Sequence, residues 1–225
     1  MKISDATKKF FEERNKIEKA VIPATQNDVP SFAFECCQNL KEVVFEDRVF
    51  TIGNFAFDCC KSLESIVLPK GVIGIGNNSF LGCTKLEKIK LPETLKVIGV
   101  GAFMCCNALT NATIPNSVTK LYESAFTNCR NLKKVALSEN ITELQRSTFS
   151  DCRSLKEIVI PQNINNIEEK TFKNCVNLEK VIFMGDVESV SKDAFEGCNK
   201  ICFYGKANTN IKKYANDFGI PFIEI

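Results

Sequence analysis

Cysteine is the side chain with the most chemistry open to it in this chain, and there are 12 cysteines in 225 residues. Three of them, Cys36, Cys59 and Cys105, stand directly before another cysteine. An even number of cysteines is typical of a disulfide framework, and clustered thiols also suggest a zinc site. Zinc-binding cysteine pairs have intervening residues, as in Cys-x-x-Cys. The adjacent pairs therefore argue against a metal centre, and we expect none.

Eight of the cysteines belong to a repeat of 23 residues. A phenylalanine, then a cysteine three positions later, then a leucine or isoleucine three positions after that, recur eight times without a slip in register. The phenylalanines are Phe34, Phe57, Phe80, Phe103, Phe126, Phe149, Phe172 and Phe195, and the cysteines are Cys37, Cys60, Cys83, Cys106, Cys129, Cys152, Cys175 and Cys198. A fixed period of this length indicates stacked units, none of which can bury its apolar face alone.

The repeat changes the interpretation of the cysteines. Stacked turns place equivalent residues about 4.8 Å apart with parallel side chains, whereas the Cβ atoms of a disulfide lie nearer to about 3.8 Å and converge. Free cysteine is also among the most buried residue types. We therefore expect a ladder of eight reduced thiols in the core. Cys36, Cys59, Cys105 and Cys202 lie outside that column, and their redox state is left open.

The chain contains no histidine, which removes Ser-His-Asp, Cys-His and His-metal sites together. No phosphate-binding loop or dinucleotide fingerprint occurs. The carboxylates near the predicted strands vary from repeat to repeat without a paired arrangement. We expect no enzyme activity and no cofactor.

Charge and hydropathy exclude further classes. The 29 basic and 27 acidic residues give a net charge of +2, which does not favour nucleic acid or an anionic membrane. No apolar run approaches the roughly 20 residues that span a bilayer. The N-terminal stretch is charged and lacks the apolar core of a signal peptide. Either the protein is cytoplasmic, or a leader has been removed.

Each repeat is predicted to form one turn of a coil. Apolar residues alternate at positions such as Ile66 and Leu68, which is the period of a short strand. Proline ends several of these strands, as Pro69 does, because it cannot donate a ladder hydrogen bond. Apolar residues then recur every third position, which suits tight turns and 3₁₀-like segments on the return. The predicted class is an α/β repeat solenoid, a right-handed superhelix with a short parallel sheet on its concave face.

The ends of the chain depart from the repeat. Residues 1–30 are interpreted as an N-terminal capping repeat, with a helix between Asp5 and Lys19, and Arg14 takes the place of the cysteine. Residues 31–204 form the 23-residue repeats. Residues 205–225 are interpreted as a C-terminal cap, with a short helix from Asn210 to Phe218 and a final extended segment. Together, residues 1–225 would form a single domain of stacked repeats.

The pattern C-x-x-L-x-x-I-x-L-P-x-x-V-x-x-I-x-x-x-(A)F resembles the BspA-like, or Treponema-type, leucine-rich repeat, from about Phe11 to Tyr204. The chain departs from ordinary leucine-rich repeats because the stacking ladder lies at the upstream cysteine. The resemblance implies a surface or secreted protein of host-associated bacteria or some protists, involved in adhesion and protein recognition.

Two columns of residues in the predicted strands face away from the core, and they are the candidate ligand-binding residues. The first column is Glu42, Ser65, Lys88, Asn111, Lys134, Glu157 and Lys180; the second is Val44, Val67, Lys90, Thr113, Ala136, Val159 and Ile182. Together they give a basic, polar middle between apolar ends. The alternative is that these residues only favour strand formation and solubility.

The leading hypothesis is a non-enzymatic protein-binding module, an adhesin-like repeat protein at the cell surface or secreted, which uses its concave face. Its partner would be a host or extracellular protein. The alternative is an intracellular or structural scaffold for protein–protein interactions. We expect a monomer that binds no nucleic acid and does not insert into a membrane; self-association through end strands or through Cys36 and Cys59 is a further option.

Overall fold

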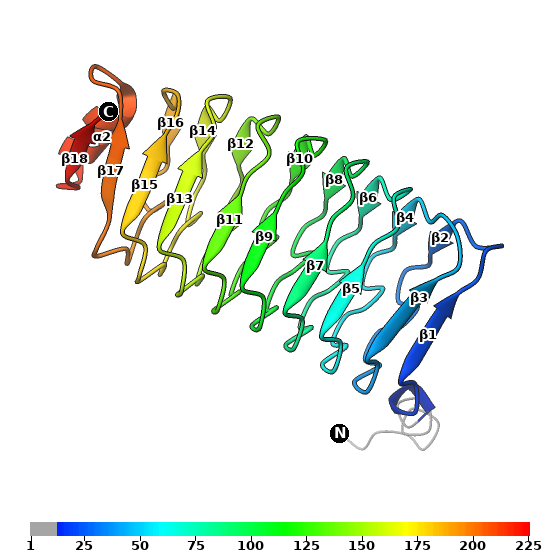
Figure 1. Ribbon diagram of the computed structural model, residues 1–225. Helices are drawn as coiled ribbons and strands as arrows, with labels where there is room; N and C mark the ends of the chain where they lie inside the picture. The colour runs from blue at the N-terminus through cyan, green and yellow to red at the C-terminus, as the bar shows by residue number, and fades with distance from the viewer. Residues whose placement is uncertain (1–12) are drawn as a thin grey trace.

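The computed structural model describes residues 13–225, which form a stack of coil turns (Figure 1). Most of the helix expected between Asp5 and Lys19, with Phe11, lies outside the described residues. Within them, residues 13–15 are helical and the first strand already begins at Lys19, so the helix ends earlier than expected. No helix in the described part is long and apolar enough to cross a membrane.

One side of the stack, here called the front, carries the strands that the alternating pattern predicts. Each begins with a residue of the first outward column, except in the first and last turns. These strands are β1 (Lys19–Ile22), β3 (Glu42–Phe45), β5 (Ser65–Val67), β7 (Lys88–Lys90), β9 (Asn111–Thr113), β11 (Lys134–Ala136), β13 (Glu157–Ile160), β15 (Lys180–Phe183) and β17 (Cys202–Gly205). Paired neighbours are parallel and offset by 23 residues, as in Ser65 opposite Lys88. The offset is 22 at the last pair, where Lys180 lies opposite Cys202.

A second parallel sheet runs along the return of each turn, here called the back, and the sequence patterns did not predict it. Its strands have two residues each: β2 (Asp28–Val29), β4 (Thr51–Ile52), β6 (Gly74–Ile75), β8 (Val97–Ile98), β10 (Lys120–Leu121), β12 (Glu143–Leu144), β14 (Asn166–Ile167) and β16 (Ser189–Val190). The return was expected to be irregular because a V-x-x-I spacing lacks the period of a strand. The repeats are therefore β-coil turns with hydrogen-bonded turns between the sheets, and the α/β class assigned to them overstates their helix content.

The two sheets are interrupted at different levels of the stack. On the front, hydrogen-bonded pairing is absent from the described strands between β3 and β5, between β7 and β9, and between β11 and β13. On the back it is absent between β10 and β12. At each of these levels the opposite sheet is paired, so every pair of neighbouring repeats is joined by at least one strand ladder.

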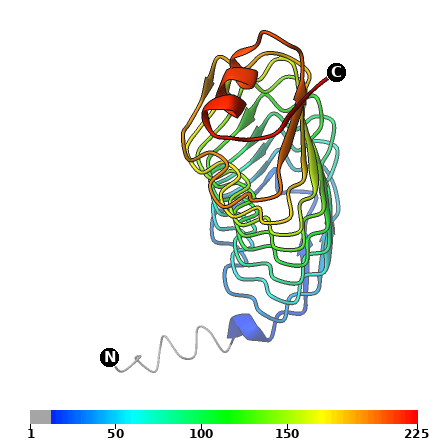
Figure 2. The same cartoon turned by 90° about the vertical axis from the view of Figure 1, so that its left-hand side faces the viewer.

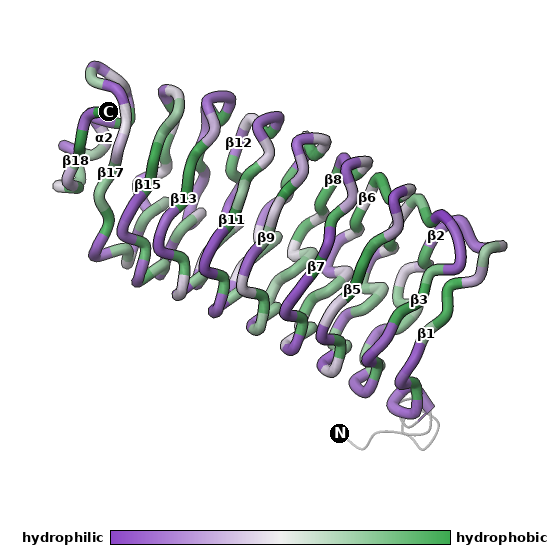
Figure 3. The backbone as a smooth tube through the Cα atoms, in the orientation of Figure 1, coloured by the Kyte–Doolittle hydropathy of each residue, from purple (hydrophilic) through white to green (hydrophobic). Residues whose placement is uncertain are grey.

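The core lies between the sheets and repeats its side chains turn by turn. The repeat phenylalanines form a continuous column from Phe34 to Phe195, with ring centroids 5.1–5.7 Å apart and nearly parallel planes. The leucine column and the strand positions such as Ile66 and Leu68 complete the core. Figure 2 shows the turns stacked in register, and Figure 3 shows both hydrophobic and hydrophilic positions along the front strands, with β5 mainly hydrophobic and β7 hydrophilic.

Two columns of residues in the turns have left-handed backbone conformation. One column contains Phe32, Phe55, Asn78, Gly101, Ser124, Ser147 and Lys170, and the other contains Cys36, Cys59, Gly82, Cys105, Asn128, Asp151, Asn174 and Gly197. Glycine, asparagine and aspartate are the residues that tolerate this conformation best. The second column accounts for three of the extra cysteines, Cys36, Cys59 and Cys105. Each occupies the left-handed position directly before a core cysteine, and its own side chain lies outside the buried column of thiols.

The last turns are followed by the helix α2 (Asn210–Asp217) and the strand β18 (Phe222–Glu224), close to the expected positions. The Thr209 side chain accepts a hydrogen bond from the Lys212 backbone N–H and so caps the helix. Gly219, at a φ of +66°, follows the helix. Ile211 and Ala215 are fully buried, and β18 pairs with β17 as the last strand of the front sheet.

The two cysteines of an adjacent pair should differ sharply in their contribution to stability. Cys59 has a φ of +57° and is half-buried, so Cys59→Gly relieves the left-handed backbone and should change the free energy of unfolding by less than about 1 kcal/mol. Cys60→Gly removes a fully buried thiol and its hydrogen bond, and should cost about 2–3 kcal/mol. Urea unfolding of both variants measures the difference; equal costs would contradict the assignment.

Candidate functional site

The described cysteines are all free thiols, and the eight of the repeat are buried. From Cys60 to Cys198, each Sγ donates to the backbone carbonyl of the phenylalanine in the preceding repeat, at 3.0–3.2 Å. Successive thiols thus form a ladder along the core. This confirms the expected thiol ladder.

The ladder thiols are poor candidates for catalysis or metal binding. Burial raises the pKa of Cys106, Cys129 and Cys152 above the ordinary value, and the thiolate is the form that reacts or binds a metal. Within residues 13–225, no cluster of three or more cysteine and carboxylate side chains is placed to hold a metal ion.

The remaining cysteines are half-buried at the turns and on β17. The Cys59 thiol is adjacent to Asp58, and burial, followed by the hydrogen bond and charge of Asp58, raises the pKa of Cys59 to about 12. Burial and the charge of Asp58 also raise the pKa of Cys36. These two thiols therefore have little thiolate at neutral pH, which makes rapid disulfide exchange unfavourable.

The predicted binding columns all lie on the front strands and alternate with buried positions, as the pattern of β5 illustrates: Ser65 and Val67 are exposed on either side of buried Ile66. Val67 retains 65% of its accessible surface. Val44, Lys180 and Ile182 are half-buried, and the other members of the two columns are exposed. The structure thus presents the fourteen residues on one face.

Toward the two ends of this face, charged side chains form ion pairs with each other. Lys19 Nζ lies 3.0 Å from a Glu42 carboxylate oxygen, and Lys180 Nζ lies 3.8 Å from Glu157. Lys180 also lies over the Tyr204 ring, 5.0 Å from its centroid. Lys88, Lys90 and Lys134 take part in none of the ion pairs formed within the described residues. The middle of the face therefore keeps unneutralised positive charge.

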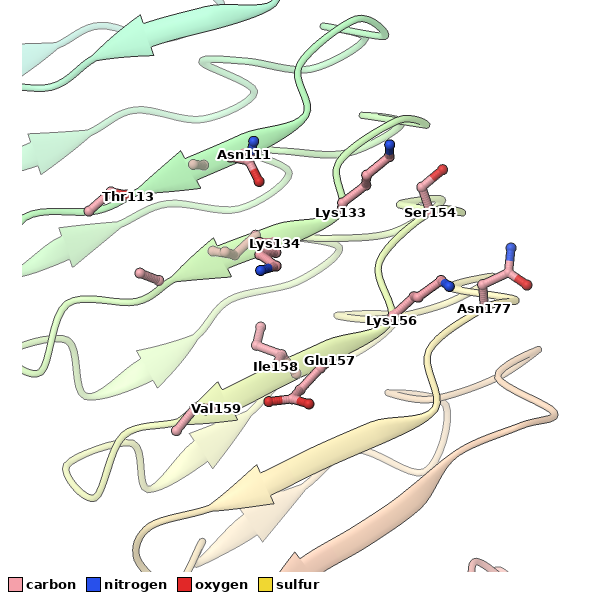
Figure 4. A pocket seen from close by; sticks show the side chains of 13 residues that line it. Asn111, Thr113, Lys133, Lys134, Ser154, Lys156, Glu157, Ile158, Val159 and Asn177 are labelled. Atoms are coloured by element: carbon pink, nitrogen blue, oxygen red, sulfur yellow. The ribbon is translucent and has the colours of Figure 1, made fainter.

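An open hollow of about 890 Å³ lies on the front over β9, β11 and β13, where the pairing between β11 and β13 is interrupted. Six of the predicted binding residues line this hollow: Asn111, Thr113, Lys134, Ala136, Glu157 and Val159. Figure 4 shows Thr113 and Val159 toward the ends of their strands, opposite the side at which the strands begin. The structure does not bring Lys88 and Lys90 into this hollow, since they lie on β7.

Four polar residues that line the hollow were missed by the sequence reasoning: Lys133, Ser154, Lys156 and Asn177. They lie in the turns that lead into the front strands, on the side where the strands begin (Figure 4). Strand alternation assigns outward positions only inside a strand, so it could not find them. The signal available was a basic residue directly before the strand in two consecutive repeats, at Lys133 and Lys156.

The hollow continues into a second, mainly apolar one of about 540 Å³ that shares Val135, Ala136 and Val159 with it and adds Leu137, Glu139, Pro161, Gln162 and Met184. Met184 retains 55% of its accessible surface. The front face over β9–β15 therefore has a basic side where the strands begin and an apolar side where they end.

The sequence matches the profile of a family described as the BspA type leucine rich repeat region, over residues 5–130 and 75–202, with six copies of the repeat. The chain belongs to this family. Leucine-rich repeat proteins are generally non-enzymatic modules for protein–protein interaction, and no enzyme family is indicated. A comparison with proteins of curated function found no match.

Several solved structures of bacterial repeat proteins are similar. A leucine-rich repeat protein from Bacteroides ovatus is 29% identical with a TM-score of 0.72, and the match covers 93% of this chain and 60% of that protein. The leucine-rich repeat protein of T. pallidum is 28% identical with a TM-score of 0.65, over 92% of this chain and 86% of that one. A leucine-rich cell surface protein from Faecalibacterium prausnitzii is 27% identical with a TM-score of 0.53, over 88% and 62%. The chain thus corresponds to about three fifths of the first and third proteins.

Thiol labelling separates the ladder from the other cysteines. In the native protein at about pH 8, the eight repeat cysteines should not react with dithionitrobenzoate, because their thiols are buried away from the reagent. After unfolding in denaturant without reductant, all 12 cysteines should react. Rapid native labelling of more than four thiols, or fewer than 12 after unfolding, would contradict the ladder of free thiols.

Proposed function

We propose that this chain is a protein-binding module that recognises its partner through the front sheet face, at the surface of a bacterial cell or as a secreted protein. One observation carries the proposal. The core positions repeat nearly the same residues in every turn, whereas the outward positions between them change from glutamate to serine, lysine, asparagine and valine. Repeat proteins use such extended, variable surfaces for binding.

The exposed apolar residues on this face support the proposal. Val67 and Val159 lie exposed on β5 and β13, and Met184 follows β15. Exposed apolar residues bordered by polar ones can mark an interaction surface. The family membership supports a role in protein interaction, and the similarity to a cell surface protein of F. prausnitzii supports the location.

Three further expectations belong to the same proposal. We expect the coil to be right-handed, because crossovers between parallel strands are right-handed in almost all proteins. We also expect α2 to close the C-terminal end of the core, since it buries Ile211 and Ala215 against the last turns. We further expect the chain to act as a monomer.

Selection of binders from a phage-displayed peptide library tests the binding face. The front variant Val67→Glu, Thr113→Glu, Val159→Glu should weaken the selected binders by about tenfold or more, because each glutamate places charge in a partly apolar contact. The control variant Thr119→Glu, Thr142→Glu, Asn165→Glu adds the same charge at exposed positions that precede or begin back strands. Binders that are lost equally with both variants, or only with the control, would contradict the front face as the binding surface.

Antibody labelling of intact cells of the source organism tests the location. If the protein is at the surface, an antibody raised against the described residues should stain unpermeabilised cells, and external protease should remove the signal. If the protein is secreted, the antibody should detect it in the medium. Detection only after permeabilisation would reject the adhesin-like role and favour the intracellular scaffold.

A further inference from the structure

We propose that the hollow over β9, β11 and β13 binds an acidic segment of a partner protein whose acidic residues are followed by aliphatic ones. This inference rests on the proposed function, because it specifies the partner chemistry of the same front face. It commits to one part of that face and to one kind of ligand.

The charge of the hollow is the first argument. Lys133, Lys134 and Lys156 are exposed around it, and none of the ion pairs within residues 13–225 includes any of the three. The one acidic side chain in the lining, Glu157, faces Lys180 at 3.8 Å. Elsewhere on the face, Lys19 and Lys180 have glutamate partners, whereas Lys88 and Lys90 on β7 form no ion pair within the described residues but lie outside the hollow. An anionic ligand complements this charge.

Hydrogen-bond donors lie beside the lysines. The Ser154 hydroxyl and the Asn177 amide lie on the same side as Lys133 and Lys156 (Figure 4), where the strands begin. The Asn177 side chain is held in place, since it donates to the Arg153 carbonyl at 2.8 Å and accepts from Lys200 Nζ at 2.8 Å. Carboxylates bind best where lysines and neutral donors converge.

The apolar side of the hollow decides between a peptide and another polyanion. Toward the strand ends the surface is formed mainly by Ala136, Val159 and, in the adjoining hollow, Leu137 and Met184, with Glu139 and Gln162 also in that lining. A peptide can place aliphatic side chains there while its carboxylates lie over the lysines. A sulfated polysaccharide carries charge along its whole length and has no group for the apolar side. The acidic-aliphatic peptide therefore fits both halves.

Fluorescence polarisation tests the proposal with a defined probe: a labelled peptide with three acidic residues followed, about two positions later, by two leucines. Lys133→Gln, Lys134→Gln, Lys156→Gln should weaken its binding by about tenfold or more, and added salt should weaken binding to the unaltered protein. The control variant Lys96→Gln, Lys120→Gln, Lys192→Gln removes the same charge from exposed positions on or next to the back strands and should bind as the unaltered protein does. Circular dichroism and urea unfolding confirm that both variants are folded.

A gain of affinity provides a second, independent measurement. Glu157→Gln removes the only carboxylate in the lining and frees Lys180, so it should tighten binding of the acidic peptide by about twofold or more. The same probe with serines in place of leucines should bind more weakly, and the probe with lysines in place of its acids should not bind.

Three outcomes would overturn the inference: no binding of the acidic peptide, equal loss with the control variant, or binding of a heparin fragment that depends on the same lysines while the peptide does not bind. The proposed binding face fails by a different result, namely when library-selected binders are not lost selectively with the front variant. Binders that depend on Val67, Thr113 and Val159 but not on the three lysines would leave the proposed function standing and reject this inference.

Discussion

The stacking of equivalent side chains at a 23-residue interval is the constraint on which the rest of the structure depends. From Cys60 to Cys198, each core cysteine donates its S–H to the phenylalanine carbonyl of the previous repeat, and each phenylalanine ring packs on the next at 5.1–5.7 Å. A slip of one residue would break the thiol hydrogen bonds and misplace the rings together. Each repeat buries its apolar face against its neighbour, so the core is buried only when the repeats stack in register.

This constraint leaves the outward positions free to vary. Ser65, Lys88, Asn111 and Lys134 occupy equivalent places on successive front strands, and their backbone is positioned by the strand whatever the side chain. The charge of the front face therefore varies along the stack. Glu42 and Glu157 form ion pairs with lysines, while Lys133, Lys134 and Lys156 form no ion pair within the described residues. The basic side and the apolar side of the hollow arise from two ends of the same three strands. The residues proposed for recognition are thus different from the residues that form the core of each repeat.

The 23-residue repeat made much of the fold predictable from the sequence, and the features that it did not predict have physical reasons. The thiol ladder, the front strands and the outward columns followed from spacing alone, because strand alternation and burial act at every turn. The back sheet did not, since two-residue strands such as Gly74–Ile75 are too short to leave an alternating pattern. The left-handed position of Cys59 was not predicted, although glycine, asparagine and aspartate stand at the equivalent positions of other repeats and favour that backbone conformation. Lys133 and Lys156 were missed because the side-chain direction in a turn depends on the backbone path, which spacing does not give.

The staggered interruptions of the two sheets have a mechanical consequence. The front pairing is absent between β11 and β13, but at that level β12 and β14 are paired on the back; the back pairing is absent between β10 and β12, where β9 and β11 are paired on the front. A force that pulled the two ends of the chain apart would therefore meet a strand ladder at every level of the described stack, on the front, on the back or on both sides. The stack has no single plane along which it could shear open, and it can still bend slightly where one side is unpaired. Under tension, we therefore expect the stack to bend at the levels where one sheet is unpaired before any repeat unfolds.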